Sequence, residues 1–200
     1  MNQRDLVLHA TAIKRHAPAE AIAHLAGLPV EMVQAELDAA VATGRALEAK
    51  QAYALTPLAG VALQARYSSI FAELRADEGF RAAYEGFERI NRNLKQIITD
   101  WQTMDVGGQK VANDHSDKAH DEDVIDRLGG LHEQAEPILD GLAKKAPRLK
   151  YYADKLLAAL EAAEDGDHEW VSDIRRDSYH TVWFELHEEL LRTMGCEREE

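Results

Sequence analysis

The 200-residue chain has little cysteine, little proline and no long apolar run. The shortage of cysteine and the lack of a long apolar run each exclude a class of protein. Its one cysteine, Cys196, allows no intramolecular disulfide and no metal site built from several cysteines. No stretch approaches the roughly 18 consecutive apolar residues that a membrane-spanning helix needs, and the polar start before Leu6 is unlike a signal peptide. These shortages predict a protein of the cytoplasm.

The composition favours a folded, mainly α-helical protein with an excess of acid. Hydrophobic residues make up 46% of the chain, charged residues 30%, and there are only 5 prolines. The net charge is −13, yet acidic and basic residues cancel between residues 1 and 66. We therefore expect two parts, an N-terminal module over 1–66 and an acidic α-helical domain over 67–200.

The N-terminal module carries the pattern of a winged helix-turn-helix. Apolar spacing and Pro/Gly punctuation predict short helices over 4–16 and 19–26, and a third from Pro29 to a stop at Gly44. Residues 46–55 partly alternate between apolar and polar, as in a small β-hairpin. Thr56 and Pro57 then form an N-cap and first-turn pair that starts a long helix.

The remainder is predicted to form a helical bundle. Two apolar stripes repeat every three or four residues, one from Phe80 to Trp101 and one from Val124 to Leu142. The last helix is expected from about Ser178 to Met194. The polar segment from Thr103 to His120 is long enough to be functional rather than a simple connector.

The predicted recognition helix has the wrong charge for DNA. From Val30 to Gly44 it contains Glu31, Glu36 and Asp38 but no lysine or arginine. Affinity for DNA comes largely from cations that contact phosphates. Protein docking is therefore favoured for this module, although DNA binding stays open.

The acidic domain holds six of the nine histidines, and two regions stand out. A polar segment combines histidines and carboxylates, the ligand types of zinc, iron or manganese, but without a diagnostic spacing. The last helix places histidines on the same face as aromatic residues, which is suited to lining a pocket. The alternative is that the helix histidines are core residues and the polar segment is a solvated loop. The candidate ligand- or partner-binding residues are Asn113, Asp114, His115, His120, Tyr179, His180, Trp183 and His187, and any metal ligands would be Asp114, His115, His120 and His187.

The sequence contains no convincing catalytic residue and no evident cofactor motif. Cys196 lies in a terminal tail without a neighbouring base, and no phosphate-binding glycine motif occurs. Catalysis by this chain alone is therefore not expected, although an enzyme site built from the histidines stays possible.

Four runs of the sequence resemble a known bacterial appendage. They are LHATAIKRHAPAEAIAHLAGLPVEMVQAEL, followed by YALTPLAG, near the N-terminus, then NDHSDKAHDEDVIDRLGGLHEQAEPIL (Asn113 to Leu139) and GDHEWVSDIRRDSYHTVWFELHEELLRTMG (Gly166 to Gly195). Together they resemble the winged-helix and helical C-terminal extension of some pyruvate, phosphate dikinase-type proteins, which use phosphoenolpyruvate. The resemblance covers nearly the whole chain.

The resemblance implies a stand-alone, non-catalytic accessory subunit of a phosphoenolpyruvate-utilising phosphotransferase. The nucleotide-binding, swivelling and phosphoenolpyruvate-binding domains of such enzymes would lie on separate partner subunits, because none of them fits in this chain. The helical domain would supply a pocket for a ligand or partner. The alternative is a ligand-responsive winged-helix transcriptional regulator, which would act as a dimer on paired half-sites.

Overall fold

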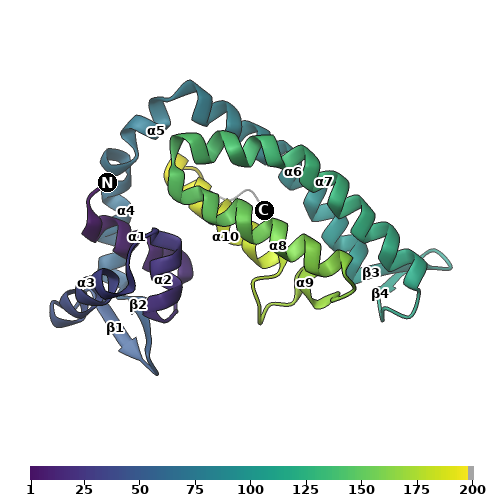
Figure 1. The fold of residues 1–200 in the computed structure, drawn as a ribbon, viewed down its shortest axis with the longest axis horizontal. Helices are drawn as coiled ribbons and strands as arrows, with labels where there is room; N and C mark the ends of the chain where they lie inside the picture. The colour runs from purple at the N-terminus through teal and green to yellow at the C-terminus, as the bar shows by residue number, and fades with distance from the viewer. Residues whose placement is uncertain (198–200) are drawn as a thin grey trace. The chain divides into compact units, whose positions relative to one another are not determined.

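The computed structural model describes residues 1–197 and is mainly helical, as predicted (Figure 1). Within these residues it contains ten α-helices, one short 3-10 helix and two small antiparallel hairpins. The chain forms two compact units. The first unit comprises Met1–Glu78 with the chain from Glu185 onward, and the second comprises Gly79–Phe184.

Three short helices open the first unit: α1 (Gln3–Lys14), α2 (Ala19–Ala26) and α3 (Val30–Ala42). Asn2 caps α1 through a hydrogen bond from the Asp5 backbone N–H. Gly27 ends α2 in the left-handed conformation, with φ +64°, which glycine adopts without steric cost. The helices predicted from apolar spacing in this region are confirmed.

A hairpin follows, formed by β1 (Ala46–Ala49) and β2 (Ala52–Leu55) in antiparallel register, and it confirms the predicted strand pair. The two turn residues between the strands, Lys50 and Gln51, both have positive φ, which matches the twist of a tight hairpin. Tyr53 of β2 also forms an isolated antiparallel bridge with Ala17, so the segment before α2 joins the hairpin.

Helix α4 (Pro57–Ile70) begins at the predicted cap, where the Thr56 side chain accepts a hydrogen bond from the Ala59 N–H. It ends at Phe71 and is followed by the short α5 (Ala72–Ala76), so the long helix expected here is divided in two. A buried core cluster of this unit consists of Leu8, Ala40, Ala46, Leu63, Tyr67 and Phe71.

The last part of α10 (Tyr179–Met194) also belongs to the first unit. Lys14 of α1 forms an ion pair with Glu185 at 2.9 Å. Arg75 of α5 donates from Nε to the Thr193 carbonyl at 2.6 Å and so satisfies a terminal carbonyl of α10. The units therefore differ from the predicted segments 1–66 and 67–200, because periodicity along a helix does not reveal which distant helix it packs on.

The second unit is built on α6 (Glu78–Gln102), α7 (Lys118–Lys145) and α8 (Lys150–Glu164), with the short α9 (Glu169–Ser172) and the start of α10. Most residues of the two predicted apolar stripes are buried. A Cβ at Gly86 would lie 3.0 Å from Ile138 Cδ1, so this glycine lets α6 and α7 approach closely. Pro137 lies inside the continuous α7, and Pro147 opens the 3-10 turn Pro147–Leu149 before α8.

The polar segment between α6 and α7 forms a second hairpin that the sequence analysis did not predict. Its strands are β3 (Thr103–Val106) and β4 (Gln109–Ala112), joined by Gly107 and Gly108, which both have positive φ. Among the described helices, none is both long and apolar enough to cross a membrane.

Candidate functional site

The hairpin exit and the first turn of α7 bring two predicted polar residues, Asn113 and His115, to one buried carboxylate. Asp121, which is 1% exposed, accepts a hydrogen bond from Asn113 Nδ2 at 2.8 Å. Its other contact is His115, whose Nδ1 lies 3.0 Å from Oδ2. Asp121 lies in the first turn of α7, where the positive end of the helix dipole stabilises a carboxylate.

The backbone around His115 is held in an uncommon conformation. His115 has a φ of +60°, a left-handed value that is costly for a residue with a side chain. Its N–H donates to Asn113 Oδ1 at 2.9 Å, and Asn113 Nδ2 also donates to the Trp101 carbonyl. The Asn113 side chain therefore fixes both the turn and the carboxylate that faces His115.

Aromatic contacts complete this cluster, which we call the His115 cluster (Asn113, His115, Asp121, Trp101 and His168). The His115 ring lies against the buried Trp101 indole at a centroid distance of 4.6 Å, and His168 contacts the same indole edge-on at 5.7 Å. The His115 side chain remains 42% exposed. With Nδ1 facing Asp121, Nε2 is the ring nitrogen left for a partner group.

Two other predicted residues of this segment have structural contacts. His120 Nε2 lies 2.9 Å from the Asp100 carbonyl, so that nitrogen serves as a donor within the fold. Asp114 accepts a hydrogen bond from the Ser116 N–H, and hydrogen bonds from Ser116 lower the pKa of the Asp114 carboxyl. Both residues are therefore anchored by hydrogen bonds within the fold, in the same segment as His115.

The predicted aromatic face of the last helix is a buried network in the second unit. Trp183 stacks on Phe87 at 4.6 Å and donates from Nε1 to Asn91 Oδ1 at 3.0 Å. Tyr179 stacks on Trp183, and its hydroxyl lies 3.1 Å from His132 Nδ1. Because these polar atoms are buried and paired with one another, the contacts fit a core role for Tyr179 and Trp183.

Burial sets the protonation of the Tyr179 and His132 pair. Burial lowers the pKa of the His132 imidazole, despite the neighbouring Glu136 and Glu164, and it raises the pKa of the Tyr179 hydroxyl. A neutral imidazole and a protonated phenol follow. The Tyr179 O–H therefore donates to His132 Nδ1, a pairing whose partner His132 the sequence analysis missed.

The eight predicted residues do not converge on one site. Trp101 of the His115 cluster and Asn91 of the aromatic network are ten residues apart on α6, or about 15 Å along the helix axis. His180 is partly buried, and burial lowers its pKa. His187 is buried and belongs to the first unit. No group of three or more metal-binding side chains is present within residues 1–197.

The first unit contains a second buried polar network that the sequence analysis did not identify. His9 Nδ1 lies 2.9 Å from the Tyr67 hydroxyl, and its Nε2 lies 3.2 Å from Glu189 Oε1. The His9 and Glu189 side chains are each 1% exposed. These residues join α1, α4 and α10, and the spacing within each of these distant segments does not reveal that they meet.

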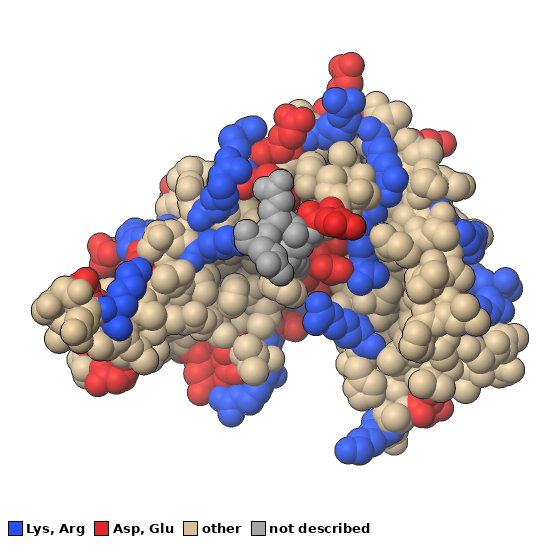
Figure 2. All heavy atoms as spheres, turned by 180° about the vertical axis from the view of Figure 1, so that it is seen from behind, with Lys and Arg blue, Asp and Glu red and all other residues tan. Residues whose placement is uncertain are grey.

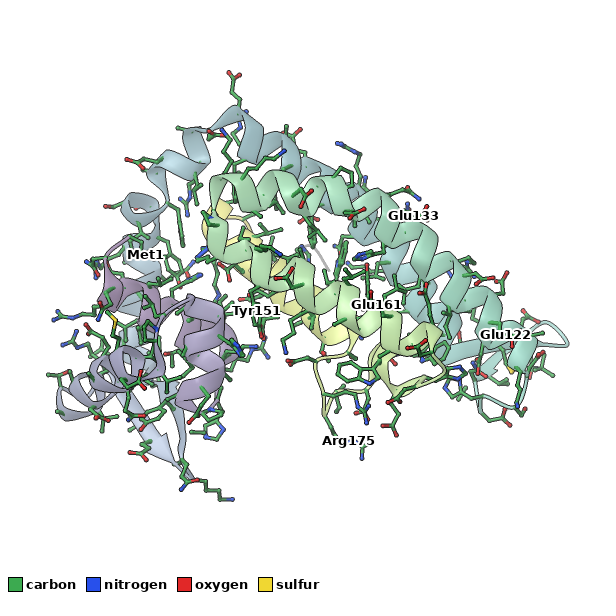
Figure 3. The ribbon with its side chains drawn as sticks, viewed as in Figure 1. Met1, Glu122, Glu133, Tyr151, Glu161 and Arg175 are labelled. Atoms are coloured by element: carbon green, nitrogen blue, oxygen red, sulfur yellow. The ribbon has the colours of Figure 1, made fainter. Side chains whose placement is uncertain are left out.

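Exposed helix faces in both units carry acidic residues. Glu122 and Glu133 project from α7 and Glu161 from α8, so these acids of the second unit are solvated helix charges (Figure 3). Lys and Arg side chains are interspersed with Asp and Glu over the face drawn in Figure 2. Helix α3 exposes one face without any cation: Glu31, Met32, Ala35, Asp38, Ala39 and Ala42.

Comparison of the chain with protein-family models, with curated protein sequences and with solved structures found no match.

Proposed function

We propose that this chain is a non-catalytic accessory subunit that docks onto another protein through the exposed face of α3. In this proposal the first unit is a winged helix used for protein contact. The second unit presents the His115 cluster to a ligand or partner. The partner is a nucleotide- or phosphoenolpyruvate-binding subunit of a phosphotransferase of the pyruvate, phosphate dikinase type.

The observation that carries the proposal is the chemistry of the α3 face. Its exposed residues combine two carboxylates, Glu31 and Asp38, with the apolar Met32 and several alanines. Small apolar side chains allow a close approach, and carboxylates are suited to a basic rim on a partner protein. A phosphate backbone would instead repel this face.

The partner class rests on the sequence resemblance described above. The runs from Asn113 to Leu139 and from Gly166 to Gly195 supply much of the second unit and all of α10. Tyr179, Trp183 and every member of the His115 cluster except Trp101 lie in the segments that resemble the appendage. In this proposal the catalytic domains are carried by the partner.

The test is affinity purification of the tagged full chain from its native cells. We expect a phosphoenolpyruvate- or nucleotide-binding subunit to co-purify with the chain. The α3 double variant Glu31→Lys with Asp38→Lys should recover at least tenfold less of that subunit. The matched control is Glu122→Lys with Glu133→Lys, which makes the same charge change on α7. If no such subunit co-purifies, or if both double variants lose it equally, the proposal is wrong.

The alternative function is a winged-helix transcriptional regulator. It is supported by the order of three helices and a hairpin, and by the Ala17 and Tyr53 bridge that adds a third strand position. Fluorescence anisotropy with duplex DNA at low salt discriminates the two functions, because phosphate contacts make DNA binding strongly salt-dependent. Binding that weakens steeply with salt, by a dimeric chain, would favour the regulator.

A further inference from the structure

Helix α4 exposes an apolar stripe where a surface helix normally carries polar residues. The exposed residues Leu58, Val61, Ala62 and Ala65 follow the spacing i, i+3, i+4 and i+7, so they lie along one face. Leu58 is 80% exposed and Val61 is 68% exposed. The opposite face buries Leu63 and Tyr67 in the core of the first unit. A helix that is apolar on both faces is usually covered on both.

A groove of about 280 Å³ adjoins this stripe within the first unit. Leu8 and Leu63 are buried residues of its lining, and Leu58, Ala59 and Ala62 line it from α4. The turn between α3 and β1, at Gly44, lines it as well. The groove and the stripe share Leu58 and Ala62 and form one continuous apolar surface, which we call the α4 surface.

The α4 surface is bordered by cations in a chain whose net charge is −13. Its lining includes Arg45 and Arg66 and no acidic residue. Asp5 holds Arg66 through a two-pronged contact at 2.6 and 2.7 Å. Arg45 donates from Nε to Thr43 Oγ1, and within residues 1–197 its two η nitrogens have no hydrogen-bond partner. The guanidinium of Arg45 is therefore available to a carboxylate from outside.

From this geometry we infer that the α4 surface is a docking site for an acidic amphipathic helix of a partner protein. The helix packs its apolar face along Leu58 and Val61, places one apolar side chain in the groove, and pairs a flanking carboxylate with Arg45. This is the helix-in-groove mode of recognition, in which anchors at i, i+3 or i+4 and i+7 span two turns. The inference is independent of the α3 face and goes beyond the function proposed above.

Two features favour a peptide helix over the other occupants. The surface is an open groove continuous with an exposed stripe, whereas small-molecule sites usually enclose most of their ligand. A second copy of the chain would present its own arginine-bordered surface to this one, which gives no charge complementarity. An acidic helix would cover the apolar stripe and place a carboxylate against the Arg45 guanidinium.

The test uses the full chain and two labelled synthetic helices. Both peptides carry leucines at i, i+3, i+4 and i+7, one flanked by glutamates and the other by lysines. We expect fluorescence anisotropy to show at least tenfold tighter binding of the glutamate peptide. Leu58→Ser with Val61→Ser should weaken that binding at least tenfold, and Arg45→Gln by roughly 3- to 10-fold, about 0.7 to 1.4 kcal/mol.

The matched control is Leu157→Ser, which removes an exposed leucine from α8 of the second unit and should leave binding unchanged. Circular dichroism checks that each variant folds, which is expected because all the altered side chains are at least partly exposed. The inference is overturned if neither peptide binds, if both peptides bind equally, or if Leu157→Ser weakens binding as much as the α4 variants. It is also overturned if sedimentation shows a dimer of the free chain that the α4 variants abolish.

Discussion

Replacing Tyr179 by phenylalanine should destabilise the second unit by about 1–2 kcal/mol and leave its fold unchanged. The Tyr179 side chain is fully buried, and its hydroxyl lies 3.1 Å from His132 Nδ1. The phenylalanine ring keeps the stacking contact with Trp183 and loses only the O–H donor. A neutral hydrogen bond contributes about 0.5–1.5 kcal/mol, and a buried acceptor left without a partner adds to that cost.

Intrinsic tryptophan fluorescence is a selective probe for this measurement. Trp101, Trp170 and Trp183 all lie in the second unit, so a urea titration followed by fluorescence reports the unfolding of that unit. Circular dichroism, followed in parallel, reports whether the first unit unfolds at the same urea concentration. The expected result is a lower urea midpoint with an unchanged slope.

A double-mutant cycle with His132→Leu tests whether the loss of stability in Tyr179→Phe comes from the hydrogen bond between Tyr179 and His132. If the hydroxyl acts through His132, the two substitutions together should cost less than the sum of their separate effects, by about 0.5–1.5 kcal/mol. An unchanged free energy of unfolding in Tyr179→Phe, or strictly additive effects, would refute the core role assigned to this network. Tyr179 would then be a candidate for ligand contact, as the sequence analysis also allowed.

Two further predictions concern stability. Because burial lowers the pKa of His132, the folded state binds its proton less readily than the unfolded state, whose histidine pKa is near 6.5. This contribution to stability is complete above pH 6.5 and decreases as the pH falls below it, by at most about 1.4 kcal/mol per pH unit. The difference between urea midpoints at pH 7.5 and pH 5.5 should therefore be smaller in His132→Gln than in the unchanged chain. Thr56→Ala removes the cap of α4 and the bonds from Thr56 Oγ1 to the Gly44 and Arg45 carbonyls. It should cost about 1 kcal/mol in circular dichroism melts, whereas Ser69→Ala on the exposed side of α4 should cost little.

The local structure of the first unit could be predicted because its signals are local. Thr56 caps α4 through its own side chain, and Pro57 occupies a first-turn position, so two neighbouring residues define where the helix begins. Gly27 ends α2 for a similarly local reason. The end of α4 at Phe71 was missed, because apolar residues continue on both sides of it and no glycine or proline marks the break.

The second hairpin was missed because neither of its strands contains a buried residue. Every residue of β4 is exposed, so the sequence from Gln109 to Ala112 shows no alternation of buried and exposed side chains. The signal that was present is the Gly107 and Gly108 pair, which is typical of a tight two-residue turn. The hairpin matters for the candidate site, because Asn113 and His115 directly follow it and lie at the start of α7.

The composition of the candidate site was predictable, but its geometry was not. Crowding of histidines and carboxylates in one segment indicated Asn113 and His115, which do share one carboxylate. The residue that organises them, Asp121, was not singled out from the sequence, because its burial follows from its position on the inner face of α7. His168 comes from a distant segment and could be connected with Trp101 only by the three-dimensional fold.

In α4, apolar residues lie both in the buried core and on the exposed α4 surface, and the sequence does not distinguish the two. Val61 and Leu63 are both apolar residues of α4, yet Leu63 is buried and Val61 is exposed. Apolar side chains on the inner face stabilise the fold, and those on the outer face lower solubility unless something covers them. Since α3 exposes acids and the α4 surface is bordered by arginines, the first unit presents two surfaces of opposite charge. A partner that contacted both would need a basic region for α3 and an acidic helix for α4, so the loss of binding in the variants at Glu31, Asp38 and Arg45 would measure how much each surface contributes to the affinity.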